Sequence, residues 1–309
     1  MWESFIETVT KVNDWVNGVV WGWPMIVMIL GTGILLTVRT KVLQVRKFGE
    51  SLSSTIVPVV KGLGKKQGKR DKNSISQFEA FSAAISGTVG TGNIIGVTSA
   101  ILTGGPGAVM WMWISAFVGM VTNYSENVLG LYYRRKEKDG SFSGGAFYYI
   151  AYGLKQNWLG LFAAVFCLLA ATGMSGVQTN KITGSFISVL NTDETWVKLL
   201  IGSVVALFAA VVIIGGIKRI GRIASMLVPF MSVLFIIMSF IIIGKNIGAV
   251  PETFRLIFSS AFSAKAVAGG VGGFVFSQII KKGLARGVFS NEAGLGSSVI
   301  AHSASETRE

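Results

Sequence analysis

The sequence has few charged residues and almost none of the side chains that usually build catalytic or metal sites. Of its 309 residues, 14% are charged, against roughly 25% in a typical soluble domain. One cysteine, Cys167, and one histidine, His302, exclude an intrachain disulfide and disfavour a zinc site made of these residue types. It also lacks a phosphate-binding loop motif and a nucleophile–base set, so we expect neither an enzyme nor an organic cofactor.

Hydrophobic residues dominate instead, and they occur in runs long enough to cross a membrane. They make up 51% of the chain, and the mean hydropathy is +0.59. About 20 apolar residues in one helix span the hydrocarbon core of a bilayer. The sequence therefore predicts an all-α polytopic protein of the cell membrane, in contact with the lipid bilayer. Its predicted spans are 19–38, 78–102, 109–131, 159–190, 197–214 and 223–243.

Positive charge is the second bias of the composition. The net charge is +13, but the basic residues lie in loops between apolar runs, which argues against a nucleic-acid partner. Loops rich in lysine and arginine face the cytoplasm. The loop 39–77 is therefore predicted to be cytoplasmic. Glu3, Glu7 and Asp14 precede the first run, so we expect the N-terminus outside.

A glycine-rich stretch interrupts the run that begins at Phe78. Residues 86–96 contain four glycines and two threonines between apolar flanks. Backbone groups freed by such a break are tolerated in a bilayer only where they line a protein cavity or hold a ligand. Secondary transporters form substrate and ion sites in this way. The alternative is a glycine-rich helix that packs closely on a neighbour.

The last segment, residues 267–302, carries a second set of glycines. Lys281, Arg286 and Glu292 are too polar for a lipid-facing span, so a soluble or interfacial segment is one interpretation. The other is a second broken helix, with its break at residues 290–294. Paired glycine-interrupted segments in corresponding places of two halves point to a transporter binding site.

The polar groups at the first break suit a zwitterionic solute and a hard cation. Thr91, Gly92 and Asn93 offer a hydroxyl, an unshielded amide and a carboxamide. A half-helix N-terminus attracts a carboxylate, and unwound carbonyls coordinate sodium. These three residues are therefore candidate substrate contacts, and the backbone carbonyls of Ser86 and Val89 are candidate sodium ligands.

Further candidates lie elsewhere in the chain. At the second break, Asn291 and the backbone of Ala293 and Gly294 could face the same small solute. Gln178 is a polar residue in an otherwise apolar run, and it is either a substrate contact or a hydrogen-bonding link between helices.

Three acidic residues keep a proton-coupled mechanism open. Glu79, Glu126 and Glu292 lie in predicted spans or at their ends, and intramembrane carboxylates are functional candidates by default. The charge of Glu126 could equally be met by basic residues at the cytoplasmic end of its helix.

Several motifs resemble those of the alanine or glycine:cation symporters, a family of bacterial and archaeal sodium:amino-acid transporters. The likeness covers nearly the whole chain, and the motif SNEAGLGS at residues 290–297 is long enough to be specific. The matching segments are 87–96 with 104–108, 111–117, 144–145, 177–180, 215–218 and 286–297.

The resemblance implies a leucine-transporter-like fold of two inverted five-helix repeats. Within a single transporter domain, 1–309, it places an extra N-terminal helix at 19–38, the basic loop at 39–77 and the first repeat at 78–244. Residues 245–309 would hold an external stretch and the first broken helix of the second repeat. Family members continue well past this point, so we expect the chain to be C-terminally truncated.

The function implied by the resemblance is alternating-access symport of sodium with alanine or glycine into the cell. Thr91, Gly92 and Asn93 match the family's substrate-binding turn, Gln178 matches a polar substrate contact, and residues 291–294 match its broken sixth helix. Two alternatives stay open: a non-transporting membrane fragment or scaffold, and a proton-coupled amino-acid permease.

Overall fold

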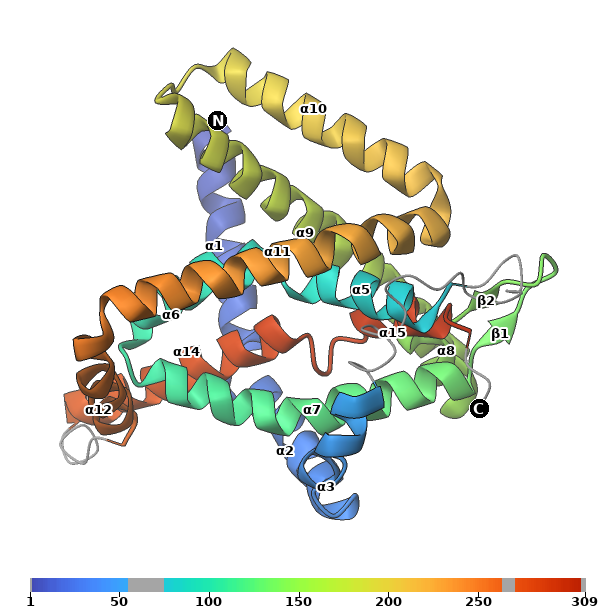
Figure 1. Ribbon diagram of the computed structural model, residues 1–309, viewed down its shortest axis with the longest axis horizontal. Helices are drawn as coiled ribbons and strands as arrows, with labels where there is room; N and C mark the ends of the chain where they lie inside the picture. The colour runs from blue at the N-terminus through green and yellow to red at the C-terminus, as the bar shows by residue number, and fades with distance from the viewer. Residues whose placement is uncertain (1, 55–74, 263–269, 307–309) are drawn as a thin grey trace. The chain divides into compact units, whose positions relative to one another are not determined.

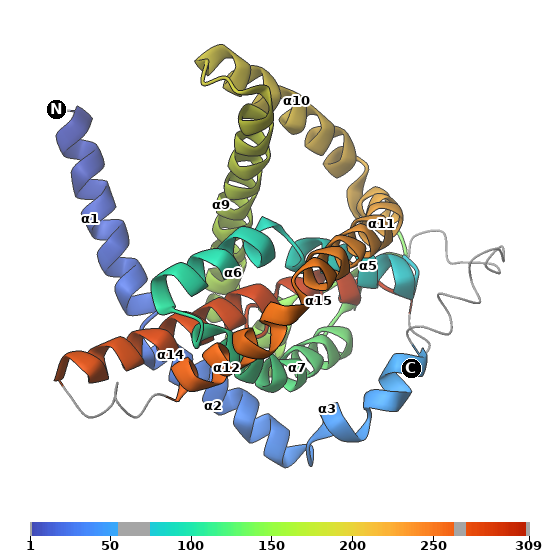
Figure 2. The ribbon, with the colours of Figure 1, turned by 60° about the vertical axis from the view of Figure 1, so that its left-hand side comes forward.

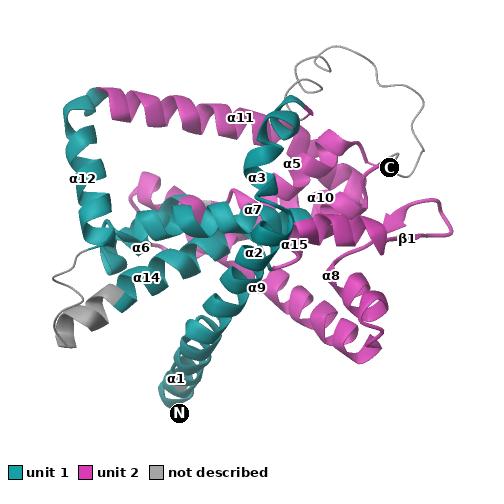
Figure 3. Cartoon of the chain, turned by 90° about the horizontal axis from the view of Figure 1, so that it is seen from below, with its two compact units in different colours: residues 1–53, 94–124, 245–294 teal, residues 54–93, 125–244, 295–309 magenta. Residues whose placement is uncertain are grey.

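The chain is mostly α-helical in a computed structural model that describes residues 2–54, 75–262 and 270–306 (Figure 1). It forms two compact units (Figure 3). The first comprises residues 1–53, 94–124 and 245–294, and the second comprises residues 54–93, 125–244 and 295–309. Each unit therefore combines segments that are far apart in the sequence. Most of the predicted basic loop, residues 55–74, lies outside the described residues.

The first unit is built from helices of the N-terminal, central and C-terminal parts of the chain. Its elements are α1 (Trp2–Val20), α2 (Trp23–Arg39), α3 (Leu43–Arg46), most of α6 (Thr91–Gly104), most of α7 (Ala108–Tyr132), η2 (Ile247–Ala249), α12 (Val250–Ala261) and α14 (Gly270–Asn291). Within it, α14 contacts both α2 and α12.

The first helix of the chain was not predicted. The first run was expected at 19–38, whereas α1 ends at Val20 and α2 begins at Trp23. Pro24 lies in the first turn of α2, where its missing N–H leaves no hydrogen bond unmade. Polar residues such as Glu7 and Lys11, which form an ion pair of 2.7 Å one turn apart, interrupt the apolar character of α1.

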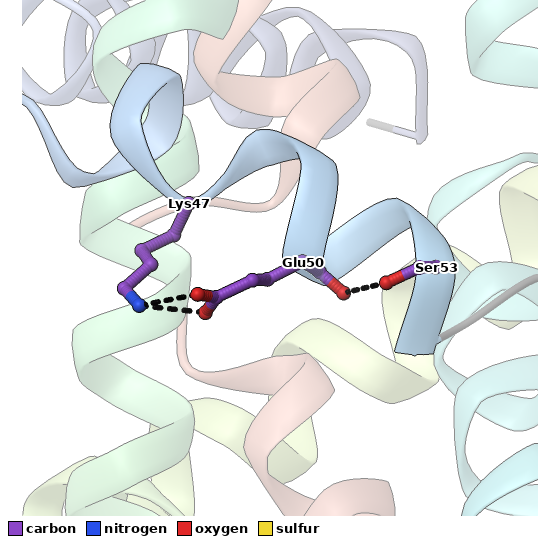
Figure 4. A network of polar contacts seen from close by, with 3 residues as sticks. All are labelled: Lys47, Glu50 and Ser53. Carbon is purple, nitrogen blue, oxygen red and sulfur yellow. Dashed lines mark hydrogen bonds and ion pairs between the residues drawn. The ribbon is translucent and has the colours of Figure 1, made fainter.

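Beyond α3, residues 48–54 are helical and carry a small polar network (Figure 4). The ammonium group of Lys47 donates to both carboxylate oxygens of Glu50, at 2.6 and 2.7 Å. The hydroxyl of Ser53 donates to the carbonyl of Glu50 at 3.0 Å. All three residues are exposed, so the network orders the surface locally and adds little stability.

Glycines bring α14 and α7 into close contact within the first unit. A Cβ atom at Gly283 would lie 2.7 Å from the Cβ of Trp111, and one at Gly287 would lie 2.6 Å from the Cβ of Ser115. These distances are too short for a real Cβ, so the two backbones approach only because both positions are glycine. Small residues serve the same purpose at contacts between membrane helices.

The second unit contains the other long helices and a short hairpin. Its elements are α5 (Gln77–Thr88), β1 (Arg135–Lys136), β2 (Phe142–Ser143), α8 (Ala146–Tyr148), the π-helix η1 (Tyr149–Gly153), α9 (Asn157–Leu190), α10 (Thr195–Ile214), α11 (Gly216–Lys245) and α15 (Ser297–Ser303). The helices α9 and α10 contact each other (Figure 2). Asn191, in the left-handed conformation with φ of 50°, begins the turn between them.

The core of the second unit lies where α15 packs on α5. Ile75, Ala80 and Ala304 are buried together, and Ile75 pairs with Ser305 in a parallel bridge. The guanidinium of Arg134 donates to the carbonyl of Ser305 at 2.7 Å. This bond joins the end of α7 to the segment after α15.

The antiparallel β1–β2 hairpin follows α7 and was not predicted from the sequence. Arg135 pairs with Ser143 and Lys136 with Phe142. In the connecting turn, hydrogen bonds from the hydroxyl and the backbone N–H of Ser141 hold the pKa of Asp139 below its ordinary value. Turn hydrogen bonds of this kind are not visible in hydrophobic periodicity, which is why the hairpin was missed.

Five stretches of the described chain are helices long and apolar enough to cross a membrane. They are Glu3–Arg39, Gln77–Gly104, Asn157–Leu190, Thr195–Ile214 and Gly216–Lys245. Many large apolar side chains of these helices are exposed; Ile214 (83% exposed) and Phe230 (69% exposed) are examples. Such surfaces require an apolar surrounding. The prediction of an all-α, multi-pass membrane protein is confirmed.

One predicted span and the segment with the second predicted break are not in this set. Residues 109–131 form α7 and the described part of 267–302 forms α14 and α15, but none of these helices is among the five. Asn123 and Glu126 in α7, and Arg286 in α14, lower their mean hydropathy.

Because α14 packs closely on α7, adding one methyl group at a glycine of this contact should lower the stability of the chain strongly. Gly287→Ala should lower the thermal unfolding midpoint of the purified chain in detergent, because overpacking costs about 1–3 kcal/mol. Gly184→Ala in α9 is the matched control, since a Cβ there would meet nothing within 4 Å. Differential scanning fluorimetry measures both midpoints, and equal values for the two variants would contradict the contact.

Candidate substrate and ion site

The first predicted break is present between α5 and α6. The helix α5 ends at Thr88, Val89 has φ −89° and ψ 75°, and α6 begins at Thr91. At its other end, α5 starts with a capping box: the hydroxyl of Ser76 accepts from the N–H of Glu79, and the carboxylate of Glu79 accepts from the N–H of Ser76. Both ends of α5 are thus defined by local hydrogen bonds.

Asn93 holds the break together. Its side-chain amide nitrogen donates to the carbonyl of Thr88 at 2.7 Å, and its backbone N–H donates to the carbonyl of Gly90 at 3.0 Å. The backbone N–H of Val89 donates to the carbonyl of Ile85 at 2.7 Å. The carboxamide of Asn93 is therefore first a link across the turn, and its oxygen and the second N–H of its nitrogen are left to meet a substrate.

The structure brings Gln178 to this break. The side-chain nitrogen of Gln178 lies so close to Gly90 that a Cβ atom there would overlap it, and the side-chain Cδ would be 3.3 Å from that Cβ. Both residues belong to the second unit. Gly90 is the position that lets α9 place an amide directly on the turn. Gln178 therefore reaches the short segment that also carries Asn93, a separately predicted site residue.

For the other residues predicted at the first break, the structure shows fewer contacts that bear on their predicted roles. Ser86 and Val89 lie in the last turn of α5 and just after it, where helix carbonyls lose their intrahelical partners. Their role as sodium ligands stays a prediction. Gly92 lies in the first turn of α6, and the side chain of Thr91 lies outside the described residues.

The second predicted break is present after Asn291, where α14 ends. Glu292 (φ 53°), Gly294 (φ 89°) and Gly296 (φ 70°) are all in left-handed backbone conformations. Glycine adopts this region readily, whereas glutamate does so at a steric cost. Three such residues in five positions turn the chain sharply before α15 begins at Ser297.

The residues of the second break pack against α7 and α2 in the first unit. A Cβ at Gly119 of α7 would lie 3.1 Å from the Cβ of Ala293 and 3.6 Å from the side-chain nitrogen of Asn291. A Cβ at Gly294 would lie 3.5 Å from the nearest side-chain carbon of Ile29 in α2. Ala293 is buried at this contact, whereas Gly294 and Leu295 are exposed.

Several polar atoms near the second break are buried without a hydrogen-bond partner. They are the hydroxyls of Ser290 and Thr122 and the side-chain nitrogen of Asn291. Thr122 and Ala293 also line a cavity of about 10 Å³, roughly the volume that one water molecule needs. Buried polar groups are nearly always paired in native proteins, so these atoms mark a place where a small polar species belongs.

Arg286 is a further polar residue with buried atoms, and it was not among the predicted site residues. Its guanidinium lies against Gly96 of α6, where a Cβ would overlap it, and stacks 5.0 Å from the ring centre of Phe289. Two of its nitrogens, Nε and Nη2, are buried without a partner. Buried guanidinium N–H groups pair best with a carboxylate, and the only sequence signal was a charge in a glycine-rich segment.

The acidic residues take different places. Glu79 caps α5, as described above, which gives its carboxylate a structural task. Burial, and secondarily the charge of Glu126, raise the pKa of Tyr149 to about 12. Proton coupling through any of the three predicted carboxylates stays a prediction.

The two breaks belong to different units: residues 86–93 lie in the second, and residues 291–294 lie in the first. That they bind one solute together stays a prediction.

Comparison with known proteins identifies the family. The sequence pattern of the sodium:alanine symporter family matches residues 6–309. The chain belongs to this family. It is a family of transporters and not of enzymes, in agreement with the sequence-based expectation.

Three relatives illustrate the range of the sodium:alanine symporter family. The sodium/alanine symporter AgcS of Methanococcus maripaludis is 41% identical over 98% of this chain and 64% of its own length. An uncharacterized transporter of Haemophilus influenzae is 38% identical over 98% of this chain and 64% of its own length. The probable sodium/glutamine symporter GlnT of Bacillus subtilis is 38% identical over 91% of this chain and 55% of its own length. The chain thus spans less than two thirds of each of these relatives.

The contact between Gly90 and Gln178 is open to a double-mutant test. Gly90→Ala should destabilise the chain by about 1–3 kcal/mol, because the new methyl group overlaps the amide of Gln178. Adding Gln178→Ala should restore most of this loss, giving a coupling between contacting residues of about 0.5–3 kcal/mol. Thermal unfolding in detergent measures both. Gly173→Ala, whose Cβ would meet nothing within 4 Å, should show no coupling to Gln178→Ala.

Proposed function

We propose that this chain carries the substrate-binding helices of a secondary transporter that couples sodium entry to uptake of a small neutral amino acid, alanine or glycine. Transport proceeds by alternating access in a leucine-transporter-like fold of two inverted repeats. Family membership supports the class of transporter, and the name of the archaeal relative, a sodium/alanine symporter at 41% identity, supports the substrate and the ion.

The observation that carries the proposal is the interrupted helix α5–α6 with Gln178 against it. The interruption lies inside a stretch long and apolar enough to cross a membrane, Gln77–Gly104. The N-terminus of α6 offers partial positive charge to a carboxylate, and the C-terminal end of α5 offers carbonyls to a cation. A turn with both properties fits an amino acid that travels with sodium.

Each predicted site residue has a role in this proposal. Thr91, Gly92 and Asn93 receive the carboxylate of the substrate at the start of α6. Gln178 contacts its polar end and, because it lies directly on Gly90, limits the room for a larger side chain. The carbonyls of Ser86 and Val89 bind sodium.

The residues predicted at the second break stay candidate substrate contacts in this proposal. They are Asn291, whose side-chain nitrogen is buried and unpaired, and the backbone of Ala293 and Gly294. The N-terminus lies outside the cell and the loop 39–77 lies in the cytoplasm.

Two relatives define the rival assignments. One is named a probable sodium/glutamine symporter, at 38% identity, and another a putative sodium/proton-dependent alanine carrier protein, at 40% identity over 91% of this chain and 54% of its own length. Glutamine as the substrate, or protons as the coupling ion, are thus the nearest competitors, beside a fragment that does not transport.

Uptake into proteoliposomes tests the proposal. An inward sodium gradient should drive accumulation of radiolabelled alanine and glycine, while the same vesicles without the gradient should only equilibrate, because the ion gradient supplies the free energy. Excess unlabelled glutamine should compete weakly. Accumulation driven by a proton gradient alone, or no uptake at all, would refute sodium coupling in this chain.

Asn93 and Thr98 provide a matched pair on α6. Asn93→Ala removes the bond to Thr88 across the break and the second side-chain N–H, which is proposed to meet the substrate carboxylate. It should weaken alanine binding at least tenfold, since losing a hydrogen bond to a charged group costs about 1.5 kcal/mol or more. Thr98→Ala removes a hydroxyl that donates only to the carbonyl of Ile94 and should bind alanine normally. Scintillation proximity binding in detergent compares the two affinities, and equal values would argue against the site.

A further inference from the structure

A pocket in the second unit lies apart from both breaks. It has a volume of about 480 Å³ and is lined by the β1 hairpin, the α8–η1 segment and the first turns of α9. Pockets that bind small molecules typically have volumes of about 300–1,000 Å³. The size therefore suits a ligand group larger than a simple ion.

One wall of the pocket is basic. It consists of Arg135, Lys136 and Glu137, within a segment, 134–139, that has four basic and two acidic residues. The guanidinium of Arg135 stacks 3.8 Å above the ring centre of Tyr152, which also lines the pocket. Stacking on a ring leaves the edge of a guanidinium, with its N–H groups, open to an anion.

The neighbouring arginine is directed elsewhere. Arg134 donates to the carbonyls of Ser303 and Ser305, at 3.3 and 2.7 Å, and its guanidinium stacks 4.0 Å from the ring centre of Phe142. It belongs to the core of the unit. Among the described residues, the side-chain contact of Arg135 is with the ring of Tyr152, and it makes no bond to the core like that of Arg134.

The floor of the pocket is apolar and belongs to a membrane helix. Gly160, Leu161 and Ala164 line it, and all three lie in the first two turns of α9, a stretch long and apolar enough to cross a membrane. Trp158 and Leu161 are 61% and 66% exposed. Tryptophan at the end of a span marks the level of the lipid headgroups.

The aromatic wall has an unusual backbone. Residues Tyr149–Gly153 form a π-helix, which places Tyr148, Ala151 and Tyr152 along the pocket. Single π-helical turns are rare and occur frequently at functional sites. Here the wider turn sets the ring of Tyr152 under Arg135.

We propose that this pocket binds the phosphate of an anionic phospholipid. Arg135 and Lys136 attract the phosphate, Tyr148 and Tyr152 surround the glycerol region, and an acyl chain follows the exposed apolar face of α9 past Leu161 into the bilayer. Basic pockets beside membrane helices on the cytoplasmic side bind anionic headgroups in this way. The inference does not depend on the identity of the transported solute.

Charge and geometry favour a lipid over a soluble anion. A free phosphate needs several donors and no apolar floor, whereas this pocket combines a basic wall with the end of a membrane span. Only an amphiphile uses both surfaces.

Native mass spectrometry of the full chain, released from nanodiscs that contain phosphatidylglycerol and phosphatidylcholine, tests the proposal. The chain should retain phosphatidylglycerol in preference. Arg135→Gln should lower the retained amount about fivefold, the effect of one basic residue at an anionic surface. Lys138→Gln removes the same charge from the same hairpin outside the pocket lining and should change retention little.

A second measurement separates the site from general charge and from folding. Phosphatidylglycerol should raise the thermal midpoint of the chain and of Lys138→Gln, but not that of Arg135→Gln or Tyr152→Leu, while far-UV circular dichroism of all four stays the same. Equal retention by the Arg135 and Lys138 variants, or equal retention of phosphatidylcholine, would overturn the proposal. Displacement of the lipid by inorganic phosphate would show a soluble-anion site and overturn it too.

Discussion

A helix that is interrupted inside a membrane must find new hydrogen-bond partners for its freed backbone groups. This constraint applies to the first break, between α5 and α6. The turn after α5 meets it largely from its own residues: Val89 donates to Ile85, and the side chain of Asn93 donates to Thr88. The turn is therefore self-supporting without a ligand. Its remaining polar groups, together with Gln178 at Gly90, can serve binding because they are not needed to hold the backbone.

The second break solves the same problem differently. Glycines at 119, 283 and 287 let α7 approach α14 and the residues after it closely, and the hydroxyl of Ser115 in α7 also donates to the carbonyl of Leu284 in α14 at 3.5 Å. Polar atoms of Thr122, Ser290, Asn291 and Arg286 stay buried and unpaired around it. Tight packing beside unpaired polar groups is a costly arrangement, and here it lies at the end of α14 and on the facing part of α7.

Basic residues serve two purposes in this chain. As a group they lie mostly in loops between apolar runs, and the orientation of the helices was predicted from this distribution. Individually they differ: Arg134 ties the end of α7 to the segment after α15, Arg135 stacks on Tyr152 beside an apolar floor, and Arg286 lies against α6. The role of each of these arginines thus depends on the aromatic ring or backbone group that the fold places beside it.

The sequence alone determined the membrane class, most helices and both breaks, because run length and glycine content act locally. The predicted first span, 19–38, corresponds to α2 with a shifted start, and α1 was missed. Charged residues within α1 interrupt the apolar run by which the other helices were recognised. The β1–β2 hairpin and the π-helix were also missed. The contacts of Gln178 with Gly90 and of Arg286 with Gly96 were decided only by the tertiary structure, because each joins helices distant in the chain, and no local pattern records which side chain a glycine makes room for.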